Sequence, residues 1–384
     1  MRRPGAPARP PMNRRTNMRR PTSGAPDYLF LGTVLTLTIF GIVMLTSASS
    51  DLASTKFGDS SYFVMHQLLY GLLPGMVGFL VGCFAYYRRW QRFATPFLVL
   101  SIVLLVLVFT GFGVSSVKGA DRWLNFGAFT FQPSELLKLT FFIYLAAWVS
   151  RSTTRGSSFV QGFLPFLTLV GGVMVLLLLQ PATTVAILIF LASVLMYFTS
   201  GAKIRFLAVA ALVVSLALSV FIYFSPYRKA RVLTFLNPTA DTADTGYHIN
   251  QALIAIGSGG WTGVGFGQST TKLYYLPEPI GDSIFAVIAE ELGFLGSLFV
   301  LLAFSVLIWR GLRIARHTSD SFGRIFVTGC TCLIGLQAFV NIAAVSGLVP
   351  LTGVPLPFVS YGGTALTVFL TMSGIMVNVS RYQS

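Results

Sequence analysis

Hydrophobic residues in this chain are gathered into long runs that short polar segments separate. A helix that crosses a bilayer needs about 17–25 predominantly apolar residues, and ten of the runs reach that length. The pattern therefore predicts an all-α polytopic membrane protein with ten transmembrane helices in one domain, residues 27–384. The ten runs cover residues 27–48, 64–86, 94–113, 134–150, 160–179, 182–200, 204–224, 283–309, 322–347 and 357–379.

The composition agrees with a membrane protein. Of the 384 residues, 54% are hydrophobic and 10% are charged, whereas an average soluble domain is about 25% charged. Cys83, Cys330 and Cys332 all lie within apolar runs, where buried thiols behave as small hydrophobic groups. No second Cys or His pair accompanies Cys330 and Cys332, and the three histidines are scattered, so the sequence predicts no metal site.

The basic residues of the connecting loops predict the orientation of the chain. If the N-terminus is cytoplasmic, every inside loop carries Lys or Arg, as the positive-inside rule expects. The largest loop, 225–281, then lies outside between the seventh and eighth helices, and both termini are cytoplasmic. The inside residues are Arg88, Arg89 and Arg92; Arg151 and Arg155; Lys203 and Arg205; Arg310, Arg313, Arg316 and Arg324; and Arg381.

Residues 1–26 form a basic, proline-rich segment without an apolar core, which predicts a disordered cytoplasmic tail. The formal net charge of +15 could suggest a nucleic-acid partner. Much of that charge, however, lies in this tail and in the inside loops, so we predict no nucleic-acid binding. We interpret the tail as a topology determinant, with contact to anionic membrane lipids or to a cytoplasmic partner as the alternative.

The most informative stretch runs from residue 272 to residue 296, where Asp282 stands at the mouth of a long apolar run. Asp282 is either a helix N-cap or a general base at the outer surface of the membrane. Glu290 and Glu291 lie about two turns further in, where a charged side chain costs about 2.5–3.5 kcal/mol at the bilayer centre. We expect one of them to make a structural hydrogen bond, with a cation or proton path as the alternative.

A second polar group opens the fourth predicted helix in the sequence FQPSELLKL. Pro133 followed by Ser134 and Glu135 is a helix start. Glu135 and Lys138 are i,i+3 neighbours and can pair. Either the pair only neutralises two charges inside the membrane, or Lys138 contacts a pyrophosphate. Arg122 is a second phosphate candidate, and its alternative is an interfacial arginine that pairs with Asp121 or with lipid headgroups.

Three outside segments contain further candidates. Residues 111–132 are Gly-rich and aromatic and are expected to form a re-entrant or interfacial loop. In the 225–281 loop, Tyr247 to Ile256 has the apolar spacing of a surface helix, and the glycines that follow are expected to make tight turns. Ser360 and Tyr361 could line a site, but Ser360 lacks the neighbouring His or Asp that an activated nucleophile needs.

Four stretches of the chain resemble the SEDS family of bacterial cell-wall proteins, which includes FtsW and RodA. With the ten predicted spans, the resemblance covers nearly the whole chain after the tail, and the segment QALIAIGSGGWTGVGFG followed by KLYYLPE is closer to the FtsW branch. The stretches are GADRWLNFGAFTFQPSELLKL at 119–139, RVLTFLNPTADTADTGYHINQALIAIGSGG at 231–260, KLYYLPEPIGDSIFAVIAEELGFLG at 272–296 and GVPLPFVSYGGTAL at 353–366.

The resemblance implies a peptidoglycan glycosyltransferase in the bacterial cytoplasmic membrane that polymerises lipid II into glycan strands during cell division. Asp282 would be the general base, and the undecaprenyl pyrophosphate would leave with inversion at the sugar. A divalent cation, Mg²⁺ or Mn²⁺, could help neutralise the pyrophosphate. The implied partners are a class B penicillin-binding protein transpeptidase and other divisome proteins. The expected substrate and pyrophosphate contacts are Arg122, Lys138, Glu135, Gln132, Ser134, Lys272 and Ser360.

Three alternatives remain open at this point: a lipid II flippase, a RodA-type elongation polymerase and a scaffold for a transpeptidase. The chain also departs from the family pattern twice. Ile280-Gly281 precede Asp282 where many members have His-Thr, so the hydrogen bonds of that pair are in doubt. Residues 180–184, QPATT, lack the carboxylate of the family's Q-P-D-x-G-T turn.

Overall fold

The computed structural model describes residues 24–383 apart from 111–112, 116–120, 128 and 237–244. Most of the predicted tail, residues 1–26, lies outside the described residues. The α-helices are α1 (Tyr28–Phe57), α2 (Tyr62–Gln67), α3 (Leu73–Phe84), α4 (Arg88–Arg92), α5 (Ala94–Leu107), α6 (Pro133–Ser150), α7 (Leu164–Leu179), α8 (Thr183–Thr199), α9 (Ile204–Tyr223), α10 (Pro226–Leu236), α11 (Thr245–Ser258), α12 (Thr271–Tyr274), α13 (Ile284–His317), α14 (Ser321–Val345) and α15 (Gly363–Ser380).

Each of the ten predicted runs coincides with a helix or with helices that continue one another. A π-helical segment, η1 (Leu68–Leu72), joins α2 to α3, and a second, η3 (Phe159–Phe163), leads into α7; a short 3₁₀ turn, η2 (Thr153–Gly156), follows α6. Within the described residues, seven helices are long and apolar enough to cross a membrane, and α5 and α8 are shorter apolar helices. The prediction of an all-α polytopic membrane fold is therefore confirmed.

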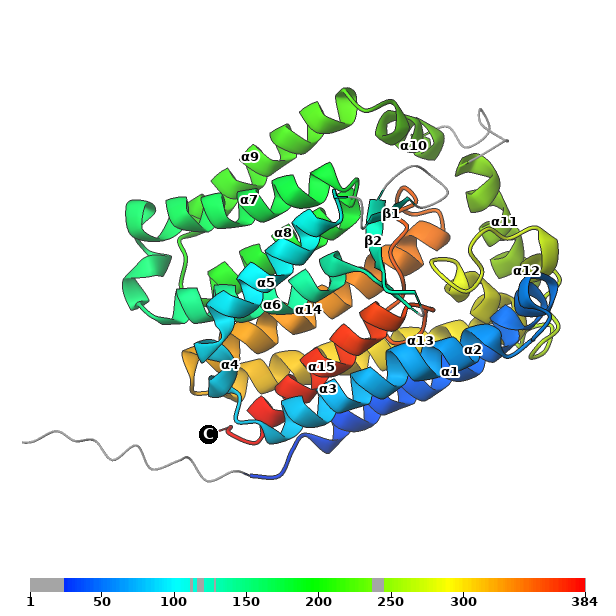
Figure 1. Ribbon diagram of the computed structural model, residues 1–384, viewed down its shortest axis with the longest axis horizontal. Helices are drawn as coiled ribbons and strands as arrows, with labels where there is room; N and C mark the ends of the chain where they lie inside the picture. The colour runs from blue at the N-terminus through cyan, green and yellow to red at the C-terminus, as the bar shows by residue number, and fades with distance from the viewer. Residues whose placement is uncertain (1–23, 111–112, 116–120, 128, 237–244, 384) are drawn as a thin grey trace, which may run out of the picture.

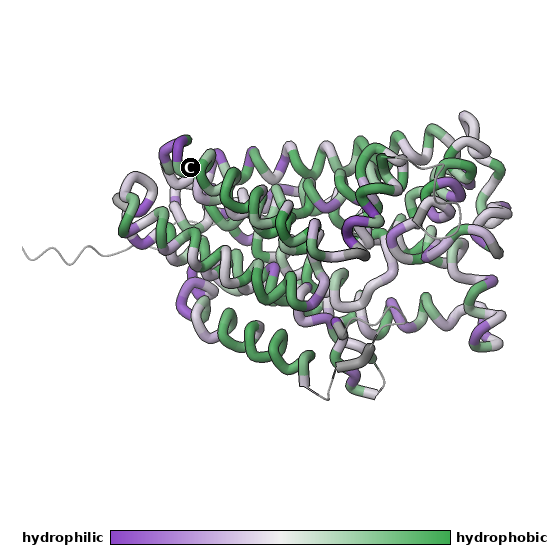
Figure 2. Tube along the Cα trace, turned by 90° about the horizontal axis from the view of Figure 1, so that it is seen from above, coloured by the Kyte–Doolittle hydropathy of each residue, from purple (hydrophilic) through white to green (hydrophobic). Residues whose placement is uncertain are grey.

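The long helices lie alongside one another in a bundle whose two ends differ (Figure 1). The start of α1 and the C-terminus lie at one end, where the backbone N–H of Gly24 donates to the carbonyl of Arg381. The small β-sheet and helices α10, α11 and α12 lie at the other end. Figure 2 shows hydrophobic positions along the long helices, with hydrophilic stretches mostly at ends and turns.

The loop 111–132 contains a small antiparallel sheet that the sequence did not indicate. Its strands are β1 (Gly113–Ser115), β2 (Asp121–Asn125) and β3 (Thr130–Phe131), in the order β1-β2-β3. Leu124 pairs with Gly113 on one side and with Phe131 on the other. Strands of two to five residues are too short to show the period-two alternation that predicts a strand. The sheet ends directly before Pro133, so it fixes the entry into α6.

Helix α13 is interrupted inside the run that predicts one continuous span. Gly293 has φ 65° and ψ −158°, a backbone region that is essentially restricted to glycine. In an uninterrupted helix the carbonyls of Glu290 and Glu291 would accept from the residues four positions on. They accept instead from the N–H groups of Val264 and Gly265, at 2.9 Å and 3.1 Å.

The backbone N–H groups that follow the break also find hydrogen-bond acceptors in the same loop. The N–H groups of Phe294 and Leu295 donate to the carbonyls of Gly260 and Trp261, at 2.9 Å and 3.2 Å. The chain after α11 is thus inserted into the hydrogen-bond ladder of α13. A Cβ on Gly263 would lie 2.1 Å from the carbonyl oxygen of Glu291, so the predicted tight turns also allow close backbone packing. Helix α11 confirms that residues 247–256 of this loop are helical.

Candidate active site

Four side chains from three helices meet on residues 351–356, which we call the central segment. Three of them donate to its backbone carbonyls: Thr184 Oγ1 to Thr352 at 3.0 Å, Gln337 Nε2 to Pro355 at 2.9 Å and Asn341 Nδ2 to Val354 at 2.8 Å. Arg231 Nη1 adds a contact of 3.2 Å to the carbonyl of Leu351. The central segment therefore links α8, α10 and α14 at one end of the bundle.

Asp282 lies beside the central segment and is half-buried. Its Oδ2 is 3.4 Å from the position that a Cβ on Gly353 would take, so glycine leaves room for the carboxylate there. The backbone carbonyl of Asp282 accepts from Asn341 Nδ2 at 2.9 Å. Ser283 occupies the N-cap position of α13. The capping interpretation of Asp282 is therefore not supported, and its carboxylate is placed at the segment where the polar groups meet.

The two residues before Asp282 are also fixed through their backbone. The hydroxyl of Ser360 donates to the carbonyl of Gly281 at 2.7 Å, and the N–H of Tyr361 donates to the carbonyl of Ile280 at 2.8 Å. These bonds come from the chain before α15 and do not use a His-Thr pair. The departure Ile280-Gly281 therefore leaves the Asp282 backbone supported.

The predicted pair on α6 is present and fully enclosed. Lys138 Nζ lies 2.7 Å from Glu135 Oε1 and 2.9 Å from Gln337 Oε1, and the lysine is 0% exposed. Gln337 in turn donates to the central segment through its Nε2, at Pro355. Lys138 is thus connected to the Asp282 region by way of Gln337. The ammonium is therefore enclosed by protein groups in this structure.

Arg122 on β2 holds the turn between α7 and α8. Its Nε donates to the carbonyl of Gln180 at 3.1 Å and its Nη2 to that of Pro181 at 2.7 Å. On the far side of this turn, Arg228 Nε donates to Thr183 Oγ1 at 2.9 Å. Both arginines therefore flank the turn that carries Thr184 to the central segment. The alternative partner Asp121 has a side chain outside the described part of the structure.

Three other predicted contacts lie near this region in supporting positions. Gln132 precedes α6, and its N–H donates to Thr364 Oγ1 at 3.3 Å. Ser134 is buried in the first turn of α6. The hydroxyl of Ser360 also accepts from the N–H of Leu356 at 2.8 Å. These positions join α6 and the central segment to the start of α15.

Lys272 occupies a different environment from the other predicted contacts. Its Nζ lies 2.7 Å from Glu291 Oε1 and 3.0 Å from Ser47 Oγ, and the lysine is buried. Glu290 is also buried and accepts hydrogen bonds from Ser269 and Thr271. The expected structural bond is thus observed for both glutamates, which bind residues of the 225–281 loop.

Several residues near Asp282 were not singled out from the sequence. His248 on α11 lies 2.6 Å from the Ser283 hydroxyl, through Nε2. His66 Nδ1 lies 2.9 Å from the Tyr361 hydroxyl. Two of the three histidines, His66 and His248, therefore contact residues close to Asp282 in the chain or in the fold. The other missed residues are Arg228, Arg231, Gln337 and Asn341.

Comparison with known proteins identifies this arrangement. The profile of the cell cycle proteins FtsW, RodA and SpoVE matches residues 27–384. The chain belongs to the FtsW/RodA/SpoVE family. It is therefore a multi-pass protein of the bacterial cytoplasmic membrane, in agreement with the SEDS resemblance of its sequence.

Relatives within the family match over almost the whole chain. A probable peptidoglycan glycosyltransferase FtsW of Geobacter sp. (strain M18) is 38% identical over 355 residues, 92% of this chain and 96% of the relative. The stage V sporulation protein E of Bacillus subtilis (strain 168) is 38% identical over 359 residues, 93% of this chain and 98% of the relative. Sequence identity alone therefore does not separate the division and sporulation branches.

Solved structures of family members share the fold. The crystal structure of the rod shape determining protein RodA of Thermus thermophilus is 27% identical, with a TM-score of 0.69, and the match covers 94% of this chain and 99% of RodA. A chain from a structure described as a peptidoglycan synthase complex that coordinates polymerization and crosslinking has a TM-score of 0.79, 27% identity and the same coverage. The helix bundle is thus the fold of this family.

Proposed function

We propose that this chain is a peptidoglycan glycosyltransferase that polymerises lipid II into glycan strands. The observation that carries the proposal is the position of Asp282. The residue lies just before α13, is half-buried and borders a segment that polar side chains from several helices hold in place. The names of the FtsW relatives support the same chemistry.

In the proposed reaction, Asp282 accepts the proton of the lipid II sugar hydroxyl that attacks the anomeric carbon of the growing strand. A glycosidic bond forms as the bond from that carbon to the undecaprenyl pyrophosphate oxygen breaks, with inversion. Negative charge then accumulates on the leaving pyrophosphate, where preorganised cations stabilise the transition state. Arg122 remains the proposed pyrophosphate contact, and Arg231 at Leu351 is a second cation beside the central segment.

In this proposal Lys138 acts indirectly, through Gln337. Its ammonium is enclosed between Glu135 and Gln337, so we propose that it stabilises the wall of the site without touching the pyrophosphate. Gln132, Ser134 and Ser360 support the same wall. Lys272 belongs to the 225–281 loop, where it pairs with Glu291.

A Mg²⁺ or Mn²⁺ ion is compatible with this arrangement. Among the described residues, no group of three or more His, Cys, Asp or Glu side chains could hold a metal ion. Mg²⁺ is commonly bound through one or two carboxylates together with substrate phosphates. The pyrophosphate would therefore provide most of the ligands, and the ion would neutralise charge on the leaving group.

We further propose a role in cell division with a class B penicillin-binding protein as the transpeptidase partner, alongside other divisome proteins. The FtsW names of several relatives support division. The structural match to a peptidoglycan synthase complex supports a partner that crosslinks the strands. A RodA-type role in elongation is the alternative, and depletion of the chain in its host distinguishes the two, since loss of division gives filaments and loss of elongation gives spheres.

The proposed topology has ten spans, cytoplasmic termini and the 225–281 loop outside. Ser258 is exposed at the end of α11, so Ser258→Cys is expected to react in intact cells with a membrane-impermeant thiol reagent. The matched control is Ser319→Cys in the α13–α14 turn, which is also exposed and should react only after permeabilisation. The opposite labelling pattern would overturn the topology and the outside location of Asp282.

The proposed activity is tested with the wild-type chain, purified with its transpeptidase and supplied with lipid II and a divalent cation. With penicillin blocking the transpeptidase, we expect glycan strands of many disaccharides on a gel. A complex that moves lipid II across vesicle membranes but makes no strands would favour the flippase alternative. The buried glutamates offer that alternative little support, because protein donors occupy both carboxylates.

A further inference from the structure

Part of the 225–281 loop binds the interrupted helix α13. We call this segment, residues 259–272, the clasp. Its backbone is inserted at Gly293, where the N–H groups of Val264 and Gly265 donate to the carbonyls of Glu290 and Glu291. The break separates a short first half of α13, residues 284–292, from the long second half. Because helix continuity is lost at Gly293, the position of the first half depends on what is bound to it.

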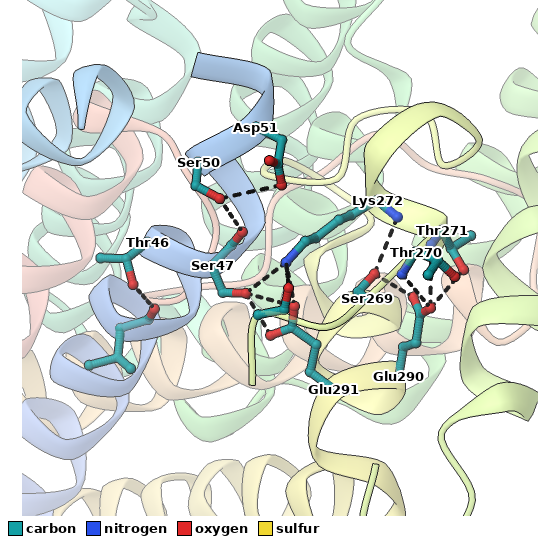
Figure 3. Close-up of polar contacts among 12 residues, drawn as sticks. Thr46, Ser47, Ser50, Asp51, Ser269, Thr270, Thr271, Lys272, Glu290 and Glu291 are labelled. Atoms are coloured by element: carbon teal, nitrogen blue, oxygen red, sulfur yellow. Dashed lines mark hydrogen bonds and ion pairs between the residues drawn. The ribbon is translucent and has the colours of Figure 1, made fainter. Parts of the chain in front are cut away.

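The first glutamate binds the clasp through four donors. Glu290 Oε1 accepts from the N–H of Thr270 at 3.1 Å, from the N–H of Thr271 at 3.3 Å and from the Thr271 hydroxyl at 2.9 Å. Its Oε2 accepts from the Ser269 hydroxyl at 2.5 Å (Figure 3). A carboxylate that is 2% exposed is thereby fully engaged by one short stretch of chain.

The second glutamate joins the clasp to α1. Lys272 donates to Glu291 Oε1 at 2.7 Å, and the Ser47 hydroxyl donates to the same carboxylate at 2.6 Å and 2.7 Å. Lys272 also lies 3.0 Å from Ser47 Oγ, so the three side chains form one closed group (Figure 3). Three segments far apart in the chain, α1, the clasp and α13, therefore meet through buried charges.

Asp282 immediately precedes the half-helix that these contacts hold. Every residue from Ile284 to Glu291 is buried, and the two glutamates stand in the last turn before the break. A displacement of the clasp would therefore move the whole rigid half-helix and the carboxylate at its start. Reacting groups need accurate placement, and a shift of 1 Å can reduce a rate about 10²-fold.

We propose that Glu290, Glu291 and Lys272 are positioning residues for Asp282. They fix the clasp and α1 to the first half of α13, and so set the distance from the Asp282 carboxylate to the central segment. Lys272 thereby acts through Glu291, not on the substrate. This inference rests on the proposed function, since it assigns Asp282 the role of base.

A purely stabilising role would have different consequences. If the clasp only stabilised the fold, its loss would reduce the amount of folded protein and leave the rate of each folded molecule unchanged. If it positions Asp282, the maximal rate per folded molecule falls while the lipid II concentration for half-maximal rate stays the same. The two roles are therefore separated by kcat and KM measured on monodisperse protein.

The first test is Glu290→Leu in the full chain with its transpeptidase. Leucine is close in size but accepts no hydrogen bond, so we expect kcat to fall at least about tenfold, with KM within about twofold of wild type. Amide exchange at Thr270 and Thr271 should become faster. Glu290→Gln keeps one oxygen acceptor and should retain much of the activity. The control is Gln268→Leu, an exposed polar residue of the clasp.

A second pair of variants tests the inference if Glu290→Leu does not fold. Thr271→Val removes one hydroxyl without a change in size and should lower kcat about two- to fivefold, in line with a single lost hydrogen bond. Lys272→Glu and Glu291→Lys should each inactivate, whereas their combination should regain part of the rate. Wild-type kcat per folded molecule in Glu290→Leu or Thr271→Val would overturn the inference. Wild type that makes no strands would instead contradict the proposed function.

Discussion

The Asp282→Asn protein is expected to fold, bind its transpeptidase and polymerise lipid II about 10²–10⁴-fold more slowly than wild type. That factor is the usual contribution of a general base. Asparagine has nearly the same shape but cannot accept a proton at neutral pH. Asn341 donates to the backbone carbonyl of Asp282, and the substitution leaves that contact in place.

The measurement is strand synthesis on a gel with the transpeptidase blocked, together with thermal unfolding of the same preparation. Asp51→Asn is a suitable control, because Asp51 is an exposed aspartate of α1. Polymerisation by Asp282→Asn within a few-fold of wild type would refute the catalytic assignment while leaving family membership intact. A large loss of thermal stability in Asp282→Asn alone would indicate a structural role for the carboxylate.

The second large effect is expected at the ion pair of α6. Lys138→Met leaves the Glu135 carboxylate buried without its cation, and removing one partner of such a pair costs about 3–5 kcal/mol. Both side chains are almost completely enclosed, at 0% and 2% exposure. We therefore expect Lys138→Met to be poorly folded, and the double variant Glu135→Gln with Lys138→Met to recover most of the stability.

The activity of the double variant shows what the pair does for the reaction. If Lys138 supports the wall of the site, the double variant should be more active than either single variant, as a double-mutant cycle measures. If the ammonium reaches the pyrophosphate, the double variant should remain as inactive as Lys138→Met despite its recovered stability. Membrane expression must be equal in all four proteins for the comparison to hold.

The helices of the bundle could be predicted from the sequence because a bilayer imposes a local rule. Each spanning segment must satisfy its own backbone hydrogen bonds and remain apolar over its length. The composition of about twenty consecutive residues therefore decides whether a helix forms, and the predicted runs coincide with helices of the structure. The pairing of Glu135 with Lys138 was predictable for the same reason, since i,i+3 neighbours share a helix face.

The small sheet and the break in α13 could not be predicted in this way. The strands are too short to show a pattern. Gly293 is one glycine in an apolar run, and glycine within a membrane helix is common. The break exists because residues 260–265, which lie some thirty positions earlier, supply the hydrogen bonds that α13 lacks there. A tertiary contact thus replaces a local one.

The sequence by itself determined the membrane class, the helical segments, the family resemblance and the choice of Asp282. These depend on composition, on spacing within one helix and on motifs of adjacent residues. Only the tertiary structure decided that Lys272 pairs with Glu291 and Ser47, that Arg231 and Asn341 join Asp282 at the central segment, and that Lys138 is enclosed. These contacts join residues that are 19 to 225 positions apart, and their energy depends on burial and on donors from other helices, which no local pattern encodes.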